Sequence, residues 1–363
     1  MTHDDDDFIQ AIPEEGPGDP GGLGGFVTGV EMDIEIVSDV EDEDDVEVKF
    51  ENLKIESFAD KLNRAIDKKG SCICVGLDPR LSQIPACIVD PITAKFGFTP
   101  EAASKALLEF NRGIIDAVCD LVPIVKPQIA FYEQYGFFGY LAFEETCRYA
   151  KSKGLMVIAD VKRSDIGTTA QAYANYFLGE VEMFDDSIKL LDVDAVTVNP
   201  YMGYDSVKPF IDTARKFGKG VFILVKTSNP SSGDIQDRFV DGGNPVYEMV
   251  AQFTESWGSQ EIGKSGYSSV GAVVGATYPA EAAKLRKLMP ETIFLVPGYG
   301  AQGGSAAEVA PCFNKDGRGA IINSSRGIIF AYEKVDGPKD GSHFEAAAHN
   351  AVLEMKKDLN SIF

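Results

Sequence analysis

Short apolar runs alternate with segments of helical periodicity along most of this chain, from about residue 57 to its end. A run of this kind is typical of a strand that is buried on both faces, as in a parallel sheet. We count eight such runs, each followed by a helical segment. The predicted strands are Cys72–Leu77, Val122–Lys126, Leu155–Lys162, Ala195–Asn199, Val221–Val225, Gly271–Gly275, Thr292–Val296 and Ala320–Asn323.

The helical segments precede, separate and follow these strands. They are predicted at Phe58–Lys68, Glu101–Val118, Phe137–Lys153, Thr169–Leu178 with a continuation to Leu191, Tyr204–Phe217, Pro245–Gly258, Pro279–Leu288, Ser305–Pro311 and Phe344–Leu359. Alternating strands and helices indicate an α/β fold with a parallel sheet, and eight repeats favour a closed (β/α)8 TIM barrel. An open doubly wound sheet is the alternative, but no strand leads into the Gly-x-Gly-x-x-Gly turn of a dinucleotide fold.

The first 55 residues differ from the rest in composition. They carry 18 acidic residues and two lysines, a net charge of −16, whereas the other 308 residues carry 38 acidic and 32 basic residues, a net −6. Residues 16–25 are rich in glycine and proline, and residues 39–47 are a run of like charge. We expect residues 1–55 to be a disordered, solvated extension rather than a binding arm, and residues 56–363 to form the barrel domain.

Several classes of protein are disfavoured by the composition. The chain has no apolar stretch long enough for a membrane span and no basic cluster suited to nucleic acid. Its N-terminus is acidic where a secretory signal is basic. The six cysteines lack metal-ligand spacing, and the three histidines (His3, His343 and His349) lie near the chain ends. We therefore expect a cytoplasmic protein with reduced thiols and without a Ser-His triad or His-ligated metal.

Charged residues stand at the ends of the first three predicted strands. These residues are Asp78, Lys126, Asp160 and Lys162. In a TIM barrel the carboxyl ends of all strands meet at one pocket, and burial of charge without a purpose is costly. The sequence therefore predicts an active site that contains alternating acids and lysines.

The seventh and eighth strands end differently. Gly298–Gly304 is a glycine-rich turn in front of a short helix, and Ser325 and Arg326 follow the eighth strand. Loops after these two strands commonly hold a phosphate in this fold, and an arginine offers a forked donor. The substrate is accordingly expected to carry a phosphate group.

The motif Asp160-x-Lys162-x-x-Asp165-Ile-Gly-x-Thr169 resembles the signature of the orotidine 5′-phosphate decarboxylase family. Its long (type 2) subgroup is similar to this chain over residues 57–361, as judged by six further motifs: Val75–Pro79, Val125–Gln128, Val198–Gly203, Lys226–Pro230, Pro297–Gln302 and Ser325–Gly327. The resemblance implies decarboxylation of orotidine 5′-monophosphate (OMP) to UMP, the last step of pyrimidine nucleotide synthesis, without a metal or organic cofactor. It also implies that Lys162 stabilises and protonates the C6 carbanion, while Asp160 keeps Lys162 charged and crowds the substrate carboxylate.

The remaining roles are also taken from the resemblance. Asp78 and Lys126 are expected to bind ribose hydroxyls and to complete the charge network, with Lys126 and Asp165 counted among the catalytic residues. Gln302 and Arg326 are expected to bind the phosphate. Asp165 and Thr169 are expected to reach the site of a second subunit in a homodimer. Either Ser228 or Asn229 is expected to contact the base. The predicted substrate-binding set also includes the strand-end residues Asn199, Gly300 and Ser325.

Two other functions remain open. A sugar-phosphate decarboxylase or epimerase of the same barrel superfamily can share the Asp-x-Lys-x-x-Asp motif and use magnesium. A non-catalytic binding protein is the second alternative, although the four charged strand-end residues argue against it.

Overall fold

The eight predicted strands form one closed parallel barrel in the computed structural model, which describes residues 55–240, 242–300 and 305–362. The strand order around the barrel is β1-β10-β9-β8-β7-β6-β3-β2. Their bounds are β1 (Ile73–Leu77), β2 (Ile124–Pro127), β3 (Met156–Arg163), β6 (Ala195–Val198), β7 (Gly220–Lys226), β8 (Ser268–Val274), β9 (Thr292–Pro297) and β10 (Ala320–Ser324). The predicted (β/α)8 fold is confirmed, and the open sheet is excluded because β1 pairs with both β2 and β10.

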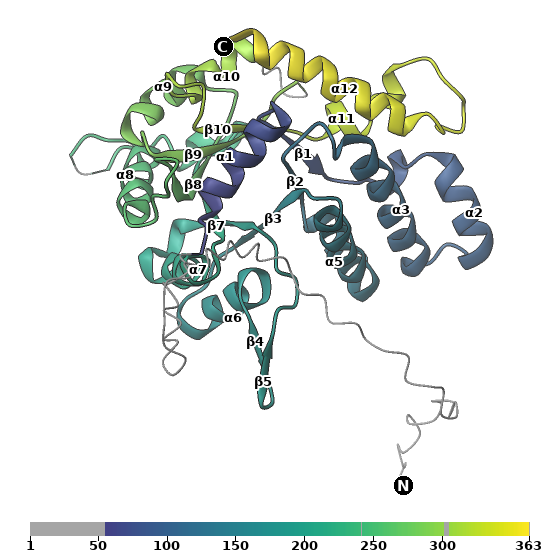
Figure 1. Ribbon diagram of the computed structural model, residues 1–363, viewed down its shortest axis with the longest axis horizontal. Helices are drawn as coiled ribbons and strands as arrows, with labels where there is room; N and C mark the ends of the chain where they lie inside the picture. Colours follow the sequence, from purple (N-terminus) through teal and green to yellow (C-terminus); the bar gives the residue numbers. More distant parts are fainter. Residues whose placement is uncertain (1–54, 241, 301–304, 363) are drawn as a thin grey trace, which may run out of the picture. The chain divides into compact units, whose positions relative to one another are not determined.

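Helices surround this barrel (Figure 1). The longer ones are α2 (Ala86–Phe96), α3 (Pro100–Val118), α5 (Gly136–Ser152), α6 (Gly167–Leu178), α7 (Tyr204–Phe217), α8 (Val246–Gly258), α9 (Pro279–Leu288) and α12 (Phe344–Leu359). Three short helices are α4 (Ala130–Glu133), α10 (Ala306–Val309) and α11 (Arg326–Ile329). The sequence pattern did not predict α2, whose interior contains Pro91 and buries only Ile88.

Helix α1 (Phe58–Lys69) closes the amino-terminal end of the barrel. It begins after Ser57, whose hydroxyl accepts a hydrogen bond from the Asp60 backbone, and ends at Gly70 in a left-handed conformation. The Phe58 ring packs edge-on against Phe222 of β7 at 5.8 Å. Gly220, at the start of β7, has no room for a side chain because a Cβ there would lie 2.4 Å from that ring.

The barrel interior next to α1 is apolar. Alternate residues of the strands form one buried cluster with α1, and the intervening residues pack outward against the surrounding helices. The inward-facing members are Cys74, Ile124, Ile158, Ala195, Phe222, Val273, Ile293, Leu295 and Ile321. This apolar layer packs beneath the polar residues at the carboxyl ends of the strands and supports them.

The predicted continuation of the α6 helix to Leu191 is wrong. Strands β4 (Val181–Met183) and β5 (Asp186–Ile188) form an antiparallel hairpin instead, which projects from the helical layer (Figure 1). Phe184 at the turn has a left-handed backbone (φ 59°), and Asp186 Oδ1 accepts a hydrogen bond from the following backbone N–H at 2.7 Å. Such local bonds compete with helix formation, which explains why the apolar spacing in this region wrongly predicted a helix.

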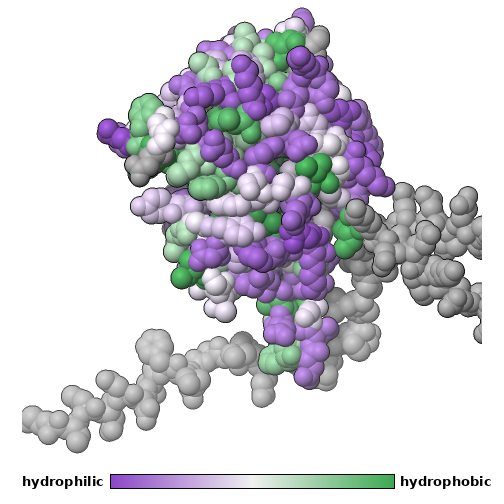
Figure 2. All heavy atoms as spheres, turned by 90° about the vertical axis from the view of Figure 1, so that its left-hand side faces the viewer, coloured by the Kyte–Doolittle hydropathy of each residue, from purple (hydrophilic) through white to green (hydrophobic). Residues whose placement is uncertain are grey.

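The visible surface is mixed in character. Figure 2 shows hydrophobic side chains scattered among hydrophilic ones over one face of the molecule. Within the described ranges, no helix has the length and apolarity that a membrane crossing requires. The extension predicted at residues 1–55 lies outside the described residues, apart from Ile55.

Candidate active site

The inward side chains become polar two residues beyond the apolar layer. Lys126, Asp160, Thr197 and Asn323 follow the inward-facing residues of β2, β3, β6 and β10, and all four are buried. Because side chains two apart in a strand share a face, these groups converge inside the carboxyl end of the barrel. The structure therefore brings together Lys126 and Asp160, with Lys162, two residues further along β3, and Asp78, which follows β1, at the same end.

Asp160 lies between two lysines. Its Oδ2 atom is 2.6 Å from Lys126 Nζ, and its Oδ1 atom is 2.5 Å from Lys162 Nζ. The side chains of Lys126 and Asp160 are almost fully buried, whereas that of Lys162 is 44% exposed. Lys162 is consequently the cation of this group that a molecule entering the barrel mouth can reach.

Charge pairing keeps the buried members ionised. Burial would raise the pKa of Asp160, but the charges and hydrogen bonds of Lys126 and Lys162 outweigh it and hold the pKa well below its usual value. Burial would likewise lower the pKa of Lys126, yet the carboxylates of Asp160 and Asp78 raise it above its ordinary value. Asp160 is therefore a carboxylate, and Lys126 an ammonium, at neutral pH.

Thr197, which the sequence analysis did not single out, shapes the end of β3. Its hydroxyl accepts hydrogen bonds from the backbone N–H groups of Val161 and Lys162, both at 3.0 Å, and donates to Asp160 Oδ1 at 2.9 Å. The register between β3 and β6 shifts here, and Lys162 has a left-handed backbone (φ 45°). A lysine seldom adopts this conformation, and such residues concentrate at functional sites. The signal available in the sequence was the position of Thr197 on the inward face, two residues before Asn199.

Two buried acceptors beside the charged group lack partners among the described residues. They are Asp78 Oδ1, after β1, and Asn323 Oδ1, in β10. Gly76 leaves no room for a side chain next to Asn323, since a Cβ there would lie 1.8 Å from Ser325 Oγ and 3.3 Å from Asn323 Oδ1. Buried acceptors without partners are rare, and these two are placed to accept hydrogen bonds from hydroxyl groups of a ligand.

The two candidates for the base contact, Ser228 and Asn229, follow the end of β7. Asn229 Oδ1 accepts a hydrogen bond from Thr227 Oγ1 at 2.6 Å. Ser228 packs its backbone against Gly275, where an added Cβ would lie 3.0 Å from Ser228 Cα. No hydrogen bond of the Ser228 hydroxyl occurs within the described part of the chain, which leaves this group available to a ligand.

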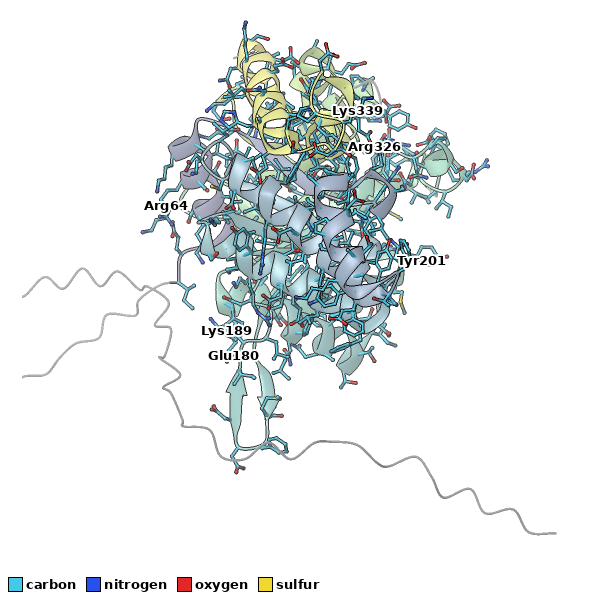
Figure 3. All side chains as sticks on the ribbon, turned by 90° about the vertical axis from the view of Figure 1, so that its right-hand side faces the viewer. Arg64, Glu180, Lys189, Tyr201, Arg326 and Lys339 are labelled. Atoms are coloured by element: carbon cyan, nitrogen blue, oxygen red, sulfur yellow. The ribbon has the colours of Figure 1, made fainter. Side chains whose placement is uncertain are left out.

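The predicted phosphate-binding residues are only partly described. Gly300 has a left-handed backbone (φ 74°), as the glycine-rich turn requires, whereas Gln302 lies outside the described residues. Arg326 begins α11 and is exposed, and its guanidinium has no protein partner in the described ranges. Figure 3 shows Arg326 near the carboxyl-terminal helices, at the opposite end of the view from Glu180 and Lys189 beside the hairpin.

Three predicted residues do not join the charged group. Asp165 lies on the loop after β3 and accepts a hydrogen bond from the Ile166 backbone at 2.8 Å. Thr169 is exposed on the first turn of α6. Asn199 Oδ1 accepts a hydrogen bond from the Tyr201 backbone at 3.0 Å, so Asn199 caps the turn after β6.

The site offers acceptors and cations but no metal cage. No group of three or more His, Cys, Asp or Glu residues in the described ranges has a metal-binding arrangement. The protein groups that can act are the Lys162 ammonium, the carboxylates of Asp160 and Asp78, the Ser228 hydroxyl and the Arg326 guanidinium.

Comparison with known proteins agrees with this geometry. The family model described as "Orotidine 5'-phosphate decarboxylase / HUMPS family" matches residues 71–337. The chain is 45% identical to an orotidine 5′-phosphate decarboxylase of Rhodopirellula baltica over 305 residues, which are 84% of this chain and 99% of the relative. A solved putative orotidine 5′-phosphate decarboxylase from Streptomyces avermitilis superposes with a TM-score of 0.68 at 32% identity, over 86% of this chain and 98% of the other.

A solved UMP synthase from Leishmania donovani is 34% identical with a TM-score of 0.64, and the match covers 85% of this chain but 56% of that longer one. The family resemblance noted in the sequence is thus confirmed by both the family model and the curated relatives. The chain belongs to the orotidine 5′-phosphate decarboxylase / HUMPS family.

Proposed function

We propose that this chain decarboxylates OMP to UMP in pyrimidine nucleotide synthesis. The observation that carries the proposal is the bridge made by Asp160 between buried Lys126 and partly exposed Lys162 at the barrel mouth. It is supported by relatives at 40–45% identity that are named orotidine 5′-phosphate decarboxylase.

The reaction breaks the bond between pyrimidine C6 and the carboxylate carbon. Carbon dioxide leaves, the electron pair stays on C6, and a proton from Lys162 Nζ then replaces the carboxylate. An ammonium fixed beside the developing negative charge stabilises the transition state without reorganisation. Asp160 orients Lys162 and stands beside the substrate carboxylate, which destabilises the bound reactant relative to the transition state.

The non-reacting parts of the substrate bind the other strand ends. The Asp78 acceptor, which has no partner among the described residues, and the ammonium of Lys126 suit the ribose hydroxyls. The Ser228 hydroxyl, which makes no hydrogen bond to the described residues, suits the pyrimidine. Arg326 and the turn containing Gly300 and Gln302 bind the phosphate. Cofactor-free decarboxylation demands a barrier reduction of about 20 kcal/mol, more than one lysine can supply, so binding energy from the phosphate contributes as well.

Asp165 and Thr169 act on a second subunit in a homodimer. Both residues lie outside the charged group of their own chain, and the loop between them exposes 49% of Ile166. Tyr201, after β6, is 84% exposed, and Figure 3 shows it at the molecular surface. Exposed apolar side chains around a catalytic loop are suited to a subunit interface.

A complementation experiment tests this arrangement. Asp165→Asn and Lys162→Ala homodimers should each be nearly inactive, whereas mixing the two after reversible dissociation should restore activity. The restored activity comes from the heterodimer site that combines the intact Lys162 of one chain with the intact Asp165 of the other. A mixture as inactive as its components would exclude the shared site.

We also propose a cytoplasmic location. All six cysteines are free thiols, as expected in a reducing compartment.

The alternative within the family is a sugar-phosphate decarboxylase or epimerase. The family model joins two names, so family membership alone does not choose between the activities. The decisive experiment is to incubate the purified chain with OMP in the presence of EDTA and to follow UMP by absorbance and chromatography. We expect turnover that resists EDTA and is lost in Lys162→Ala; absence of UMP would reject the proposal.

A further inference from the structure

Lys226, the last residue of β7, is a fully buried lysine that lies outside the candidate site. It is 1% exposed. The register between β7 and β8 shifts at Val225: Leu224 pairs with Val273, and Lys226 pairs with Val274. Because Val273 faces the barrel interior and Val274 faces outward, the bulge directs Lys226 into the helical layer.

The ammonium of Lys226 is enclosed by three side chains. It forms an ion pair with Asp237, and it lies over the rings of Tyr247 and Tyr278 at 5.2 and 4.8 Å from their centroids. Tyr247 belongs to α8 and Tyr278 directly precedes α9, two helices that pack against each other (Figure 1). Aromatic faces attract a cation, and this attraction grows when water is excluded.

Asp237 belongs to the segment that follows the candidate base contact. In the same segment, Gln236 Oε1 accepts a hydrogen bond from the Thr227 backbone at 3.0 Å, and Gln236 Nε2 donates to Thr227 Oγ1 at 2.7 Å. Thr227 in turn engages Asn229. Ser228 lies between these two held residues, so its position depends on where residues 236–237 are anchored.

We propose that Lys226 is a positioning residue that anchors this segment through Asp237 and thereby fixes the Ser228 hydroxyl where the pyrimidine is recognised. The inference rests on the proposed function and adds a specificity determinant outside the pocket. Lys226 contacts no substrate. It sets how well the site distinguishes a nucleotide from a sugar phosphate that lacks the base.

Lys226 can be replaced without leaving a buried charge that has no partner. The Asp237 side chain is 52% exposed, so it remains solvated when Lys226 is replaced by methionine. Methionine has a similar length and suits an aromatic cage. Lys226→Met should therefore fold, and Asp237→Asn offers an independent way to weaken the same link from its solvent-exposed side.

The experiment compares dissociation constants of UMP and ribose 5-phosphate. In Lys226→Met, UMP should bind about tenfold more weakly, the equivalent of one well-placed hydrogen bond, while ribose 5-phosphate binding stays unchanged. Asp237→Asn should shift UMP binding in the same direction, and the double variant should be no weaker than Lys226→Met alone. Lys219→Met, which removes a buried lysine at the other end of the barrel, is the matched control and should leave both constants unchanged.

Two results would overturn the inference: unchanged UMP affinity in Lys226→Met, or an equal loss of affinity for both ligands. Failure of the proposed function can be told apart from failure of this inference, because the wild-type protein would then neither bind UMP nor form it. A wild type that does both, with variants that bind UMP normally, rejects the anchoring role alone.

Discussion

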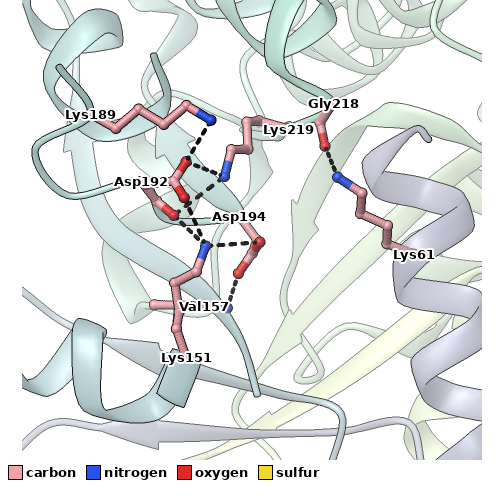
Figure 4. Close-up of polar contacts among 8 residues, drawn as sticks. All are labelled: Lys61, Lys151, Val157, Lys189, Asp192, Asp194, Gly218 and Lys219. Carbon is pink, nitrogen blue, oxygen red and sulfur yellow. Dashed lines mark hydrogen bonds and ion pairs between the residues drawn. The ribbon is translucent and has the colours of Figure 1, made fainter. Parts of the chain in front are cut away.

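Two clusters of lysines and aspartates lie at opposite ends of the same barrel. The mouth cluster, at the carboxyl ends of the strands, consists of Lys126, Asp160 and Lys162. The second cluster lies at the base of the barrel, beside the amino ends of β3, β6 and β7, and is called the base cluster for that position. It consists of Lys151, Lys189, Asp192, Asp194 and Lys219 (Figure 4). They are alike in composition and differ in what surrounds them.

Every charged side chain of the base cluster has an ion-pair partner inside the cluster. Lys151 binds the backbone carbonyl of Asp192 at 2.5 Å and lies 3.5 Å from the Asp194 carboxylate, which accepts a hydrogen bond from Val157 at the start of β3. Lys219 pairs with Asp192 at 2.7 Å. These contacts join α5 to the starts of three strands, so the base cluster stabilises the fold at the amino end of the barrel.

The mouth cluster, by contrast, lies beside groups that are unsatisfied. The neighbouring Asp78 and Asn323 carry buried acceptors without partners in the described residues, and the Lys162 side chain is 44% exposed. Buried charge therefore does not by itself identify an active site. An active site is indicated when the charges lie at the carboxyl ends of the strands and when neighbouring groups have no hydrogen-bond partner among the described residues.

Removal of the reachable cation should produce the largest difference between the clusters. Lys162→Ala is expected to lower kcat by about 10⁴-fold or more, because the proposed mechanism assigns to Lys162 both the electrostatic stabilisation and the proton donation. The matched control is Lys189→Ala in the base cluster, whose side chain is 45% exposed against 44% for Lys162. Steady-state kinetics of the control should equal those of the wild type; an equal loss in both variants would show that the two clusters do not differ in function.

Thr197→Val tests how the mouth cluster is positioned. The substitution removes the acceptor of two backbone N–H groups and the donor to Asp160, so Lys162 should lose its alignment. We expect kcat to fall about 10- to 100-fold with little change in KM. Thr213→Val, a buried threonine of α7 that contacts Gln171, controls for the loss of a hydroxyl. A change confined to KM would contradict a positioning role.

Replacing the buried lysine of each cluster should change the free energy of unfolding by different amounts. Lys126→Met leaves Asp160 buried with one partner fewer, and we expect the free energy of unfolding to fall by about 3 kcal/mol. Lys219→Met should change it by less than about 1 kcal/mol, because burial disfavours the charge at that position and Asp192 keeps Lys151 and Lys189 as partners. Urea unfolding of both variants measures the contrast, and similar losses would refute it.

The sequence foretold the barrel because strand and helix periodicities are local signals. It also located Asp78, Lys126, Asp160 and Lys162, since the carboxyl end of a parallel strand is visible as the point where an apolar run becomes charged. It could not reveal the bulge that gives Lys162 a positive φ, or the role of Thr197, because both depend on pairing between β3 and β6. The hairpin after α6 was missed because a turn at Phe184 overrides the apolar spacing around it.

A smaller effect, in the pH dependence of stability, sharpens the same comparison. Burial, reinforced by the neighbouring Lys151, lowers the pKa of Lys219 despite the nearby aspartates, whereas the pKa of Lys126 is raised by Asp160 and Asp78 against the opposing effect of burial. A lysine with a raised folded pKa stabilises the fold fully below its unfolded value of 10.5 and loses this contribution only as pH rises through the folded pKa.

A lysine with a lowered folded pKa imposes a penalty at neutral pH, which is relieved as pH rises toward 10.5. Between pH 7 and pH 10, the stability of the wild type should therefore rise relative to Lys219→Met but stay constant relative to Lys126→Met. Taking each difference against the wild type cancels the titration of groups that both proteins share. Parallel pH curves for the two variants would show that the base and mouth clusters hold their lysines alike, and that the electrostatic distinction between them is wrong.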